Sequence, residues 1–516
     1  MKQDIKSDSR DRMSYPPQIS LKVLQAEHPD FSAAKPHLER IQLLVEGGWR
    51  LRDKLGMFLK QRPGEEDAIY EARLEKFAYS GVLGPCISQM AAKLTLGTIQ
   101  LSNVTNESFW EAFKEDNNGQ GRTKTQLIEQ LFAEGLKYRT VVIHIDKPKA
   151  PVEPRSRAEE EQLGLRTNLV LYPAVQVPMW SESNGKLNWV KVFQLLDDTS
   201  DPLRKPLKLA RWTYIDNEQI AVYESFVKLG SQGQIIELLD DKGEPLPTTD
   251  GEPKVPLTSL VLHGFGVIPS AKLELPDGKW SGNHASPKAE ECLRLECHRY
   301  DLLTASYLQR TYTPHQTPDG DLGDTYVGDD EPLPTGLQYV LQVDKFEWSE
   351  PKGDIILHID KALESAEKQI RAILGTGGAY TQEPIEASGI SKEMDFEIED
   401  ARLESYGHIL TDCLQDIYQL VAKAEAQDAE SLAVSGLDEF GGDRLVDLIE
   451  ALNMLLGIDL ARLEQSLTPT LHVLIRERLL SLLMGNLTPE QRQTVLDEAA
   501  AAPMPEPVQT EFIRQA

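Results

Sequence analysis

The stretch DIILHIDKALESAEKQIRAILG, residues 354–375, is the most regular pattern in the chain. Its apolar residues recur at spacings of 3, 4, 3, 4 and 3, which predicts a helix over 356–375 with a single apolar stripe. The stripe consists of Ile356, Ile359, Leu363, Ala366, Ile370 and Ile373. Gly375 is expected to cap the C-terminus. Since such a helix is not stable alone, its stripe must pack against the core of its own subunit or against copies of the same chain.

A second amphipathic helix precedes this one and is predicted over residues 286–312. Ser286 is a favourable N-cap, and Pro287 fits the first helical position. Its stripe contains Ala289, Leu293, Cys297, Tyr300, Thr304 and Tyr307. This helix also needs a partner surface, so the two helices leave the same pair of alternatives open.

Residues 313–355, between the two helices, are rich in Pro, Gly and Asp. Strands are predicted at 337–343 and near 346–348. Five aspartates cluster here, but the sequence lacks the central glycine and the bidentate glutamate of a calcium loop. We therefore expect an exposed acidic tip and no metal site. The five are Asp319, Asp321, Asp324, Asp329 and Asp330.

The next loop, residues 376–391, is glycine-rich but does not match a phosphate-binding loop. It follows a helix instead of a strand, and no Lys-Ser/Thr pair closes it, so it is interpreted as a flexible loop between glycine hinges. A long helix is predicted from there to residue 429, with acidic first turns. Residues 430–516 are predicted to be helical, with a final tail rich in Ala and Pro.

In residues 16–285 the predicted helices come first and the predicted strands follow them. The helices are predicted over 38–62, 66–93, 105–113 and 124–138. The strands are predicted over 141–145, 169–172, 189–196, 209–215, 220–227, 235–239 and 257–262. This order predicts a largely antiparallel sheet and an α+β, helix-rich fold. His144 in the first strand is expected to be a structural side chain and not a catalytic base.

The 516 residues carry a net charge of −28, and 40% of them are hydrophobic. Residues 313–516 hold 39 Asp and Glu against 14 Lys and Arg. A protein that clamps DNA tightly needs the opposite sign, so this excess indicates either a solvated acidic surface or a surface that meets DNA without holding it. No apolar run is long enough for a membrane span, no signal peptide is evident, and residues 1–15 are expected to form a flexible arm.

The motifs of common enzymes are absent from the sequence. There is no Walker A loop, nucleophile elbow, HEXXH helix or zinc-ligand pair, and no cofactor is expected. The four scattered cysteines indicate free thiols in a reducing compartment. The sequence therefore predicts a protein that is not an enzyme, although a hydrolase site built from distant residues stays an alternative.

The order of these elements resembles that of the portal proteins of tailed bacteriophages, which connect head and tail. Local stretches add to the resemblance. They are YEARL at 70–74, AEGL at 133–136, IHIDKP at 143–148, LYP at 171–173, HGFGVIP at 263–269 and EASG at 386–389. The resemblance covers most of residues 16–500.

The resemblance implies a ring, usually of twelve subunits, with a central channel. Residues 16–285 would form the wing, 286–312 and 356–375 the stem helices, and 313–355 the clip. Residues 376–391 would form the tunnel loop, 392–429 a connecting helix, and 430–516 a helical crown.

The resemblance also implies roles for particular residues. The tunnel loop and channel would involve Gly377, Gly378, Tyr380, Gln382, Glu383, Ser388 and Lys392. Partner docking at the clip would involve Asp319, Asp321, Asp329, Tyr339 and Trp348. The loop has no Lys or Arg before Lys392, so a strong phosphate grip is not expected from it.

Two lysines of the second stem helix, Lys361 and Lys368, lie seven residues apart and therefore on one face. In a ring they would form basic rings within an acidic channel. The alternative is a simple pair between Glu364 and Lys368, four residues apart.

As a portal, the protein would conduct double-stranded DNA during packaging and ejection at the capsid vertex of the virion. It would assemble in the cytoplasm of a bacterial host, without membrane contact. Its partners would be the large terminase, the head-tail adaptor and the major capsid protein. The alternatives are another ring or scaffold component of a virion, or the soluble hydrolase above.

Overall fold

The computed structural model describes residues 14–440 with several gaps. The gaps are 98, 148–164, 200–204, 231–232, 247–251, 307–309, 315–342, 349–353, 377–388 and 438–439. Only the backbone is described for 304–306, 310–314, 343–348 and 389–398. The described part is a mixed α+β structure, as the sequence predicts.

The larger sheet of the described region has seven strands in the order β1-β10-β8-β7-β6-β5, with β9 pairing to β8. All its ladders are antiparallel, as predicted. Burial alternates along β8, because successive side chains of a strand point to opposite faces. The strands are β1 (Gln18–Ser20), β5 (Met179–Ser183), β6 (Lys186–Asp198), β7 (Leu207–Ile215), β8 (Gln219–Leu229), β9 (Ile235–Leu239) and β10 (Lys254–Leu262).

A second sheet has the order β11-β3-β4, formed by β11 (Ser270–Glu274), β3 (Thr140–Asp146) and β4 (Asn168–Pro173). His144 on β3 is buried, and its Nδ1 lies 2.9 Å from the carbonyl oxygen of Pro269. Burial lowers the pKa of His144 to about 4, so the ring is neutral near pH 7. The expectation of a structural histidine is confirmed.

Of the predicted N-terminal helices, 124–138 has the predicted bounds as α7 and 105–113 is shifted by two residues as α6. Two predicted helices, over 38–62 and 66–93, are each divided. The first stops at Gly47 and Gly48, which both have positive φ angles of 58° and 59°. The helices are α1 (Leu21–Leu24), α2 (Pro29–Glu46), α3 (Gly48–Asp53), α4 (Asp67–Glu75), α5 (Leu83–Leu94), α6 (Glu107–Glu115) and α7 (Lys124–Tyr138).

Gly84 is the reason why α5 can cross α2 so closely. A Cβ atom at Gly84 would lie 2.4 Å from the carbonyl oxygen of Val45. Gly84 and Pro85 both lie in the first turn of α5, where proline is tolerated.

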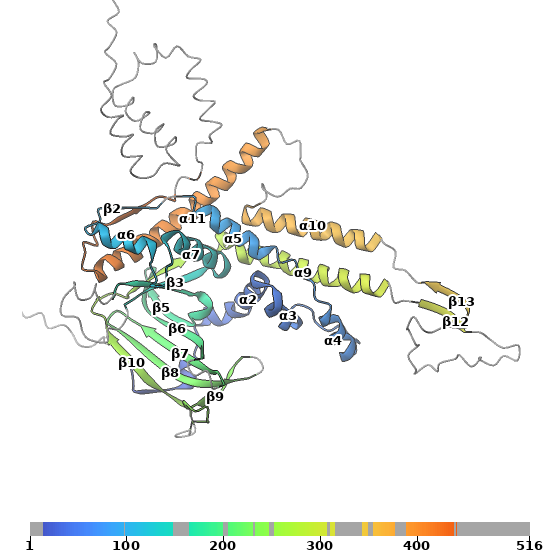
Figure 1. Ribbon diagram of the computed structural model, residues 1–516, viewed down its shortest axis with the longest axis horizontal. Coiled ribbons are helices and arrows are strands. Elements are labelled where there is room, and N and C mark those ends of the chain that lie inside the picture. Colours follow the sequence, from blue (N-terminus) through green and yellow to red (C-terminus); the bar gives the residue numbers. More distant parts are fainter. Residues whose placement is uncertain are drawn as a thin grey trace, which may run out of the picture. The chain divides into compact units, whose positions relative to one another are not determined.

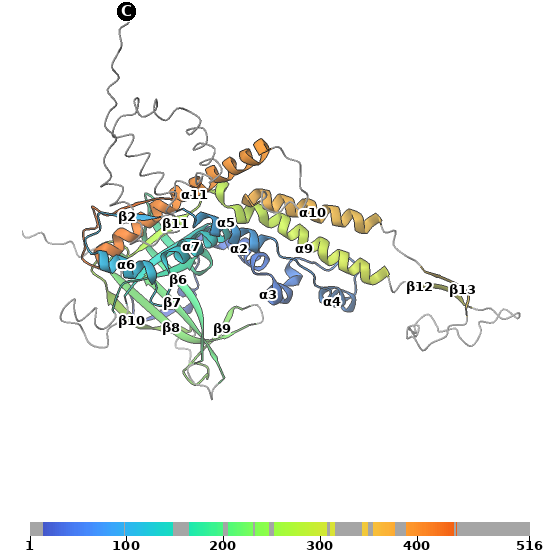
Figure 2. The ribbon, with the colours of Figure 1, turned by 45° about the horizontal axis from the view of Figure 1, so that its top comes forward.

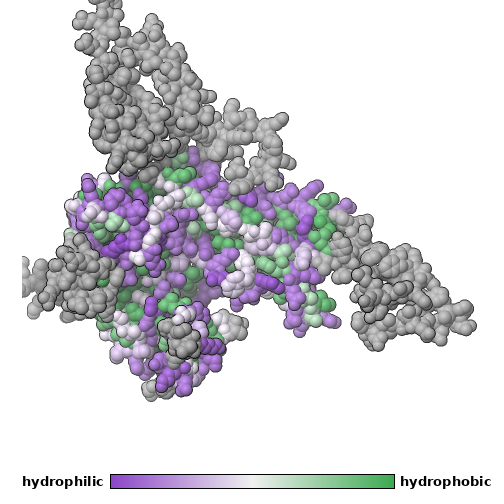
Figure 3. Space-filling model, viewed as in Figure 1, coloured by the Kyte–Doolittle hydropathy of each residue, from purple (hydrophilic) through white to green (hydrophobic). Residues whose placement is uncertain are grey.

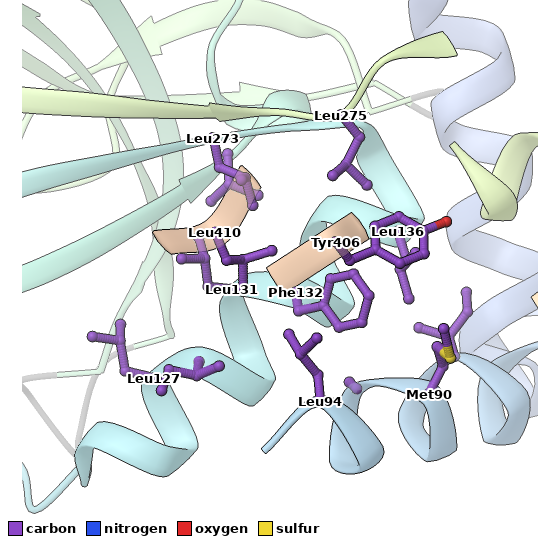
Figure 4. Packing of buried hydrophobic residues seen from close by; sticks show 14 of the residues in the cluster. Met90, Leu94, Leu127, Leu131, Phe132, Leu136, Leu273, Leu275, Tyr406 and Leu410 are labelled. Carbon is purple, nitrogen blue, oxygen red and sulfur yellow. The ribbon is translucent and has the colours of Figure 1, made fainter. Parts of the chain in front are cut away.

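The largest core of the described region forms around α11 (Gly389–Ala424). Figure 4 shows Tyr406 and Leu410 of this helix among side chains of α5, α7 and β11. The rings of Phe132 and Tyr406 lie 4.9 Å apart between centroids. Burial of this stripe explains why the acidic α11 is stable in spite of its charged first turns.

The two helices predicted from the midsection are α9 (Ser281–Ser306) and α10 (Asp354–Leu374), and they lie side by side (Figures 1 and 2). Helix α9 begins five residues before the predicted Ser286, so Pro287 lies inside it. Pro287 has no N–H and therefore cannot donate the helical hydrogen bond to the carbonyl of Asn283. That carbonyl instead accepts a hydrogen bond from Ser286 Oγ at 2.9 Å.

Helix α9 also ends earlier than predicted, at Ser306 instead of residue 312. The following Arg-Thr-Tyr-Thr-Pro sequence forms β12 (Arg310–Pro314), because β-branched and aromatic residues favour a strand. It pairs with β13 (Val343–Trp348), which confirms the strand predicted near 346–348. The strand predicted at 337–343 lies outside the described residues, apart from Val343.

The prediction of helix after residue 430 is wrong for the part that is described. Residues Ala433–Ser435 form β14, which pairs with β2 (Gln100–Ser102). The long helix predicted to reach residue 429 ends at Ala424, and Ala426 has a positive φ of 48°. Residues 441–516, the rest of the predicted crown, lie outside the described residues.

Candidate functional site

Helices α9 and α10 run antiparallel and are joined at their far ends through β12 and β13. Their 26 and 21 residues correspond to lengths of about 39 and 32 Å. One ion pair joins them, between Arg299 Nε and an oxygen of Asp360 at 2.6 Å. Arg299 lies near the end of α9 and Asp360 near the start of α10, as expected for two antiparallel helices.

The apolar stripe of α10 is buried unevenly along the helix. Its C-terminal half lies in the core of the same subunit, where Ala366 and Ile370 are 2% and 0% exposed. The stripe residue Ile373 is only partly buried, and the adjacent Leu374, 1% exposed, lies in the core instead. Complete burial of one Ile or Leu side chain stabilises a protein by about 1.5–3 kcal/mol. For this half, the subunit's own core is the partner, and the alternative of packing against other copies is wrong. Ile356, Ile359 and Leu363 in the other half are only partly buried.

The N-terminal end of α10 leaves apolar side chains in solvent. Ile355 is 49% exposed and Leu357 is 61% exposed. Tyr300, near the end of α9, is 48% exposed. Figure 3 shows hydrophobic residues gathered at this end of the helix pair. A helix whose apolar side chains are covered at one end and exposed at the other has surface left for another partner.

The solvent face of α10 carries Lys361 and Lys368. Together with Leu357 and Glu364 they follow the spacing 4, 3, 4, so they line one face of the helix. Within the described residues, neither lysine has a carboxylate within 4 Å. The pair between Glu364 and Lys368 therefore does not form here, and both ammonium groups stay exposed.

Ion pairs also join α9 to the N-terminal helices. Arg40 of α2 lies 2.6 Å from Glu290, and Lys76 lies 2.8 Å from Asp301. The four cysteines are free and buried, as predicted. Burial raises the pKa of the Cys292 thiol to about 12, so it stays protonated and unreactive.

The C-terminus of α10 is closed by the predicted cap. Gly375 has a φ of 71°, and the Thr376 N–H donates to the carbonyl of Arg371 at 2.8 Å. Arg402 of α11 adds a second cap, because its guanidinium donates to the carbonyl of Ile373 at 3.0 Å. The sequence gives no signal for this contact, which joins residues 29 positions apart.

The structure describes few of the predicted site residues. Lys361 and Lys368 are described in full. Trp348 is placed in β13 and Lys392 in α11, both by backbone alone. The others lie outside the described residues. They are Gly377, Gly378, Tyr380, Gln382, Glu383 and Ser388 of the loop, and Asp319, Asp321, Asp329 and Tyr339 of the excursion.

Two further features of the described residues bear on the site. No three His, Cys, Asp or Glu side chains there lie close enough together to hold a metal ion. In the same residues, no helix has both the length and the apolarity needed to cross a membrane.

The chain matches no known protein family and no curated protein. Solved structures do match. One of them is a chain described as "Virion of native gene transfer agent (GTA) particle", with 11% sequence identity and a TM-score of 0.34. The match covers 86% of this chain and 98% of that chain. At this distance the likeness carries no argument about function.

Proposed function

We propose that the protein is a portal, a ring of identical subunits that conducts double-stranded DNA through the capsid vertex of a phage-like virion. The observation that carries the proposal is the α9–α10 pair. It is long, it is attached to the core at one end, and it leaves Ile355 and Leu357 exposed at the other. A ring of copies would cover this end with the same element of a neighbouring subunit.

The proposed ring implies a particular type of contact at α10. One surface of the helix is already used by the subunit's core, so a neighbour can reach only the remaining surface. In a ring, this contact would join two different surface patches on identical chains, and it would close when the rotation allows it.

The charge distribution supports a channel through which DNA slides. The chain's net charge of −28 repels a duplex, whereas Lys361 and Lys368 present positive charge without a carboxylate partner in the described part. Repeated around a ring, these lysines would moderate the repulsion without creating a tight grip. In this proposal the protein has no chemistry of its own, and a terminase supplies ATP hydrolysis.

The remaining assignments belong to the same proposal. The β12–β13 hairpin and its surroundings would form the clip, which docks the terminase and later the head-tail adaptor. The loop between α10 and α11 would be the tunnel loop. The major capsid protein would surround the ring.

Mass measurement of the purified full-length chain, combined with electron microscopy along the particle axis, tests the proposal. We expect closed rings near twelve subunits with an axial opening. A stable monomer or dimer at every concentration and salt condition would refute the portal assignment. A closed ring without an axial opening would instead support a scaffold or another virion ring.

A further inference from the structure

A cavity of about 570 Å³ lies where the start of α9, the end of α10 and the middle of α11 meet. Its wall contains Lys279, which lies in a short 3-10 turn at Asp277–Lys279, and Arg402. It also contains the hydroxyl groups of Ser281, Ser405 and Tyr406, and the ring of His284. Among the described residues no Asp or Glu lines it, although the chain has 82 acidic residues.

Both cations of this wall keep their charge uncompensated. The Lys279 ammonium donates to the carbonyl of Ser405 at 2.9 Å and to the Ser405 hydroxyl. Arg402 donates through Nη1 to the carbonyls of Ala372 and Ile373. These partners are neutral, and within the described residues neither cation has a carboxylate within 4 Å.

Two carboxylates of α11 near the cavity have other groups beside them. Glu399 pairs with Lys93 of α5, and Glu404 lies 3.7 Å from Nε2 of His408. The cavity is therefore a positively charged recess on an acidic chain, and such a recess attracts an anion.

Hydrogen-bond donors remain for that anion. Arg402 keeps Nε and Nη2, since its described bonds use only Nη1. Ser405 accepts from Lys279, so its own O–H can donate. The Tyr406 hydroxyl donates to the carbonyl of Lys279 at 2.8 Å, and Ser281 therefore donates to Tyr406 at 2.9 Å. These two hydroxyls stabilise the wall, and the free donors belong to Arg402, Lys279 and Ser405.

A second, slightly larger cavity differs from this one in how its cations are paired. It measures about 580 Å³ and is lined by Lys272 and Arg139 among aromatic residues. Lys272 is paired with both Glu182 and Glu274, and Arg139 with Glu274 and Asp277. Its cations are neutralised by carboxylates, whereas those of the smaller cavity are not.

We propose that the cavity between α9, α10 and α11 binds a phosphate-type oxyanion through Arg402, Lys279 and Ser405. Guanidinium groups bind the oxygen atoms of phosphate in pairs, and lysine adds a point charge. The phosphate is either free inorganic phosphate or a phosphate of a nucleic-acid backbone. The site depends on a single subunit and does not require the portal assignment.

The test measures binding of inorganic phosphate to the full-length protein by equilibrium dialysis, with chloride used to keep the ionic strength constant. The most informative variants are at Ala401, an exposed residue of α11 on the cavity wall. Ala401→Glu places a carboxylate beside the cations, and Ala401→Gln adds a side chain of the same size without charge. We expect saturable binding by the unmodified protein and by Ala401→Gln, and at least a tenfold loss in Ala401→Glu.

Lys279→Gln should also weaken binding by about tenfold, because a charged hydrogen bond is lost. Lys423→Gln is its control, since Lys423 lies on the same helix as Arg402 but donates to the carbonyl of Phe265, away from the cavity wall. This control should bind within about twofold of the unmodified protein.

Absence of saturable binding by the unmodified protein would overturn the proposal. Equal binding by Ala401→Glu and Ala401→Gln, or equal losses in Lys279→Gln and Lys423→Gln, would also overturn it. Competition by a short DNA duplex assigns the site to backbone phosphates, and saturable phosphate binding without such competition assigns it to the free ion.

Discussion

Replacing Ile355 and Leu357 together with serine tests whether the exposed end of α10 is an interface between copies. The side chains are 49% and 61% exposed in the subunit. Complete burial of an Ile or Leu contributes about 1.5–3 kcal/mol. Scaled by the exposed fractions, covering them is worth about 1–2 kcal/mol for Leu357 and about 1 kcal/mol for Ile355. The double variant should therefore lose about 2–3 kcal/mol per interface, which is about 30- to 150-fold in the association constant.

The assay is mass photometry over a dilution series, with urea unfolding of the subunit measured in parallel. The rings should dissociate at higher concentration in the double variant, while the free energy of unfolding of the isolated subunit should change little. The control is Ile370→Ala, because Ile370 is fully buried in the subunit. That change should cost the subunit about 2–5 kcal/mol. Unchanged dissociation of the double variant, or a subunit destabilised as much as by Ile370→Ala, would refute the reasoning.

Further predictions concern the channel, the loop, one histidine and one glycine. Replacing Lys361 and Lys368 with alanine should impair DNA packaging and ejection measured on assembled particles, and unchanged rates would remove the idea of basic rings. Deleting residues 377–388 should impair packaging or DNA retention while electron microscopy still shows rings; loss of the ring would contradict the loop assignment. The pKa of His144 is lowered from 6.5 to about 4 in the folded protein. Between pH 6.5 and pH 4 the imidazole is therefore protonated in the unfolded chain but not in the folded one. The free energy of unfolding should consequently decrease as the pH falls from 6.5 to 4. Urea unfolding from pH 7 to pH 4 should show a shallower fall for His144→Phe, and an identical slope would contradict the assignment. Gly84→Ala should destabilise the subunit by about 1–3 kcal/mol in thermal unfolding, because the added methyl group collides with a carbonyl of α2; an unchanged midpoint would contradict that close contact.

The strands of the larger sheet were the easiest part of the fold to predict. Five of its seven strands, β6 to β10, have alternating or continuous apolar residues between turn signals, and the structure extends the predicted ranges by only a few residues. The short strands β1 and β5 were not predicted. The short strand at Ala433–Ser435 could not be predicted in this way. Three residues carry no period, and its formation depends on pairing with Gln100–Ser102, more than 300 positions away.

Proline and glycine set the limits of the helix predictions. Pro287 marks a helix start by local rules, yet α9 continues through it, because a side chain three residues from the orphaned carbonyl replaces the missing donor. Gly47 and Gly48 divide a stretch whose apolar period is unbroken. In both places a contact or a backbone angle decides the outcome, and neither is visible in the pattern of apolar residues.

Only the part of the site that depends on helical spacing could be predicted from the sequence. Helical spacing alone places Lys361 and Lys368 on one face, and the structure agrees. The burial of Ala366 and Ile370 within the subunit depends on α5 and α9, which the spacing cannot specify. The recess at Lys279 and Arg402 joins segments more than 100 residues apart, and no local signal marks it.

In the proposed ring, helix α10 would separate two properties that a self-associating protein usually has to balance. Its C-terminal half is buried in the core of one chain, whereas Ile355 and Leu357 near its N-terminus are exposed. Substitutions accumulating near Leu357 could therefore strengthen or weaken self-association over many generations while the chain remained equally able to reach its native state.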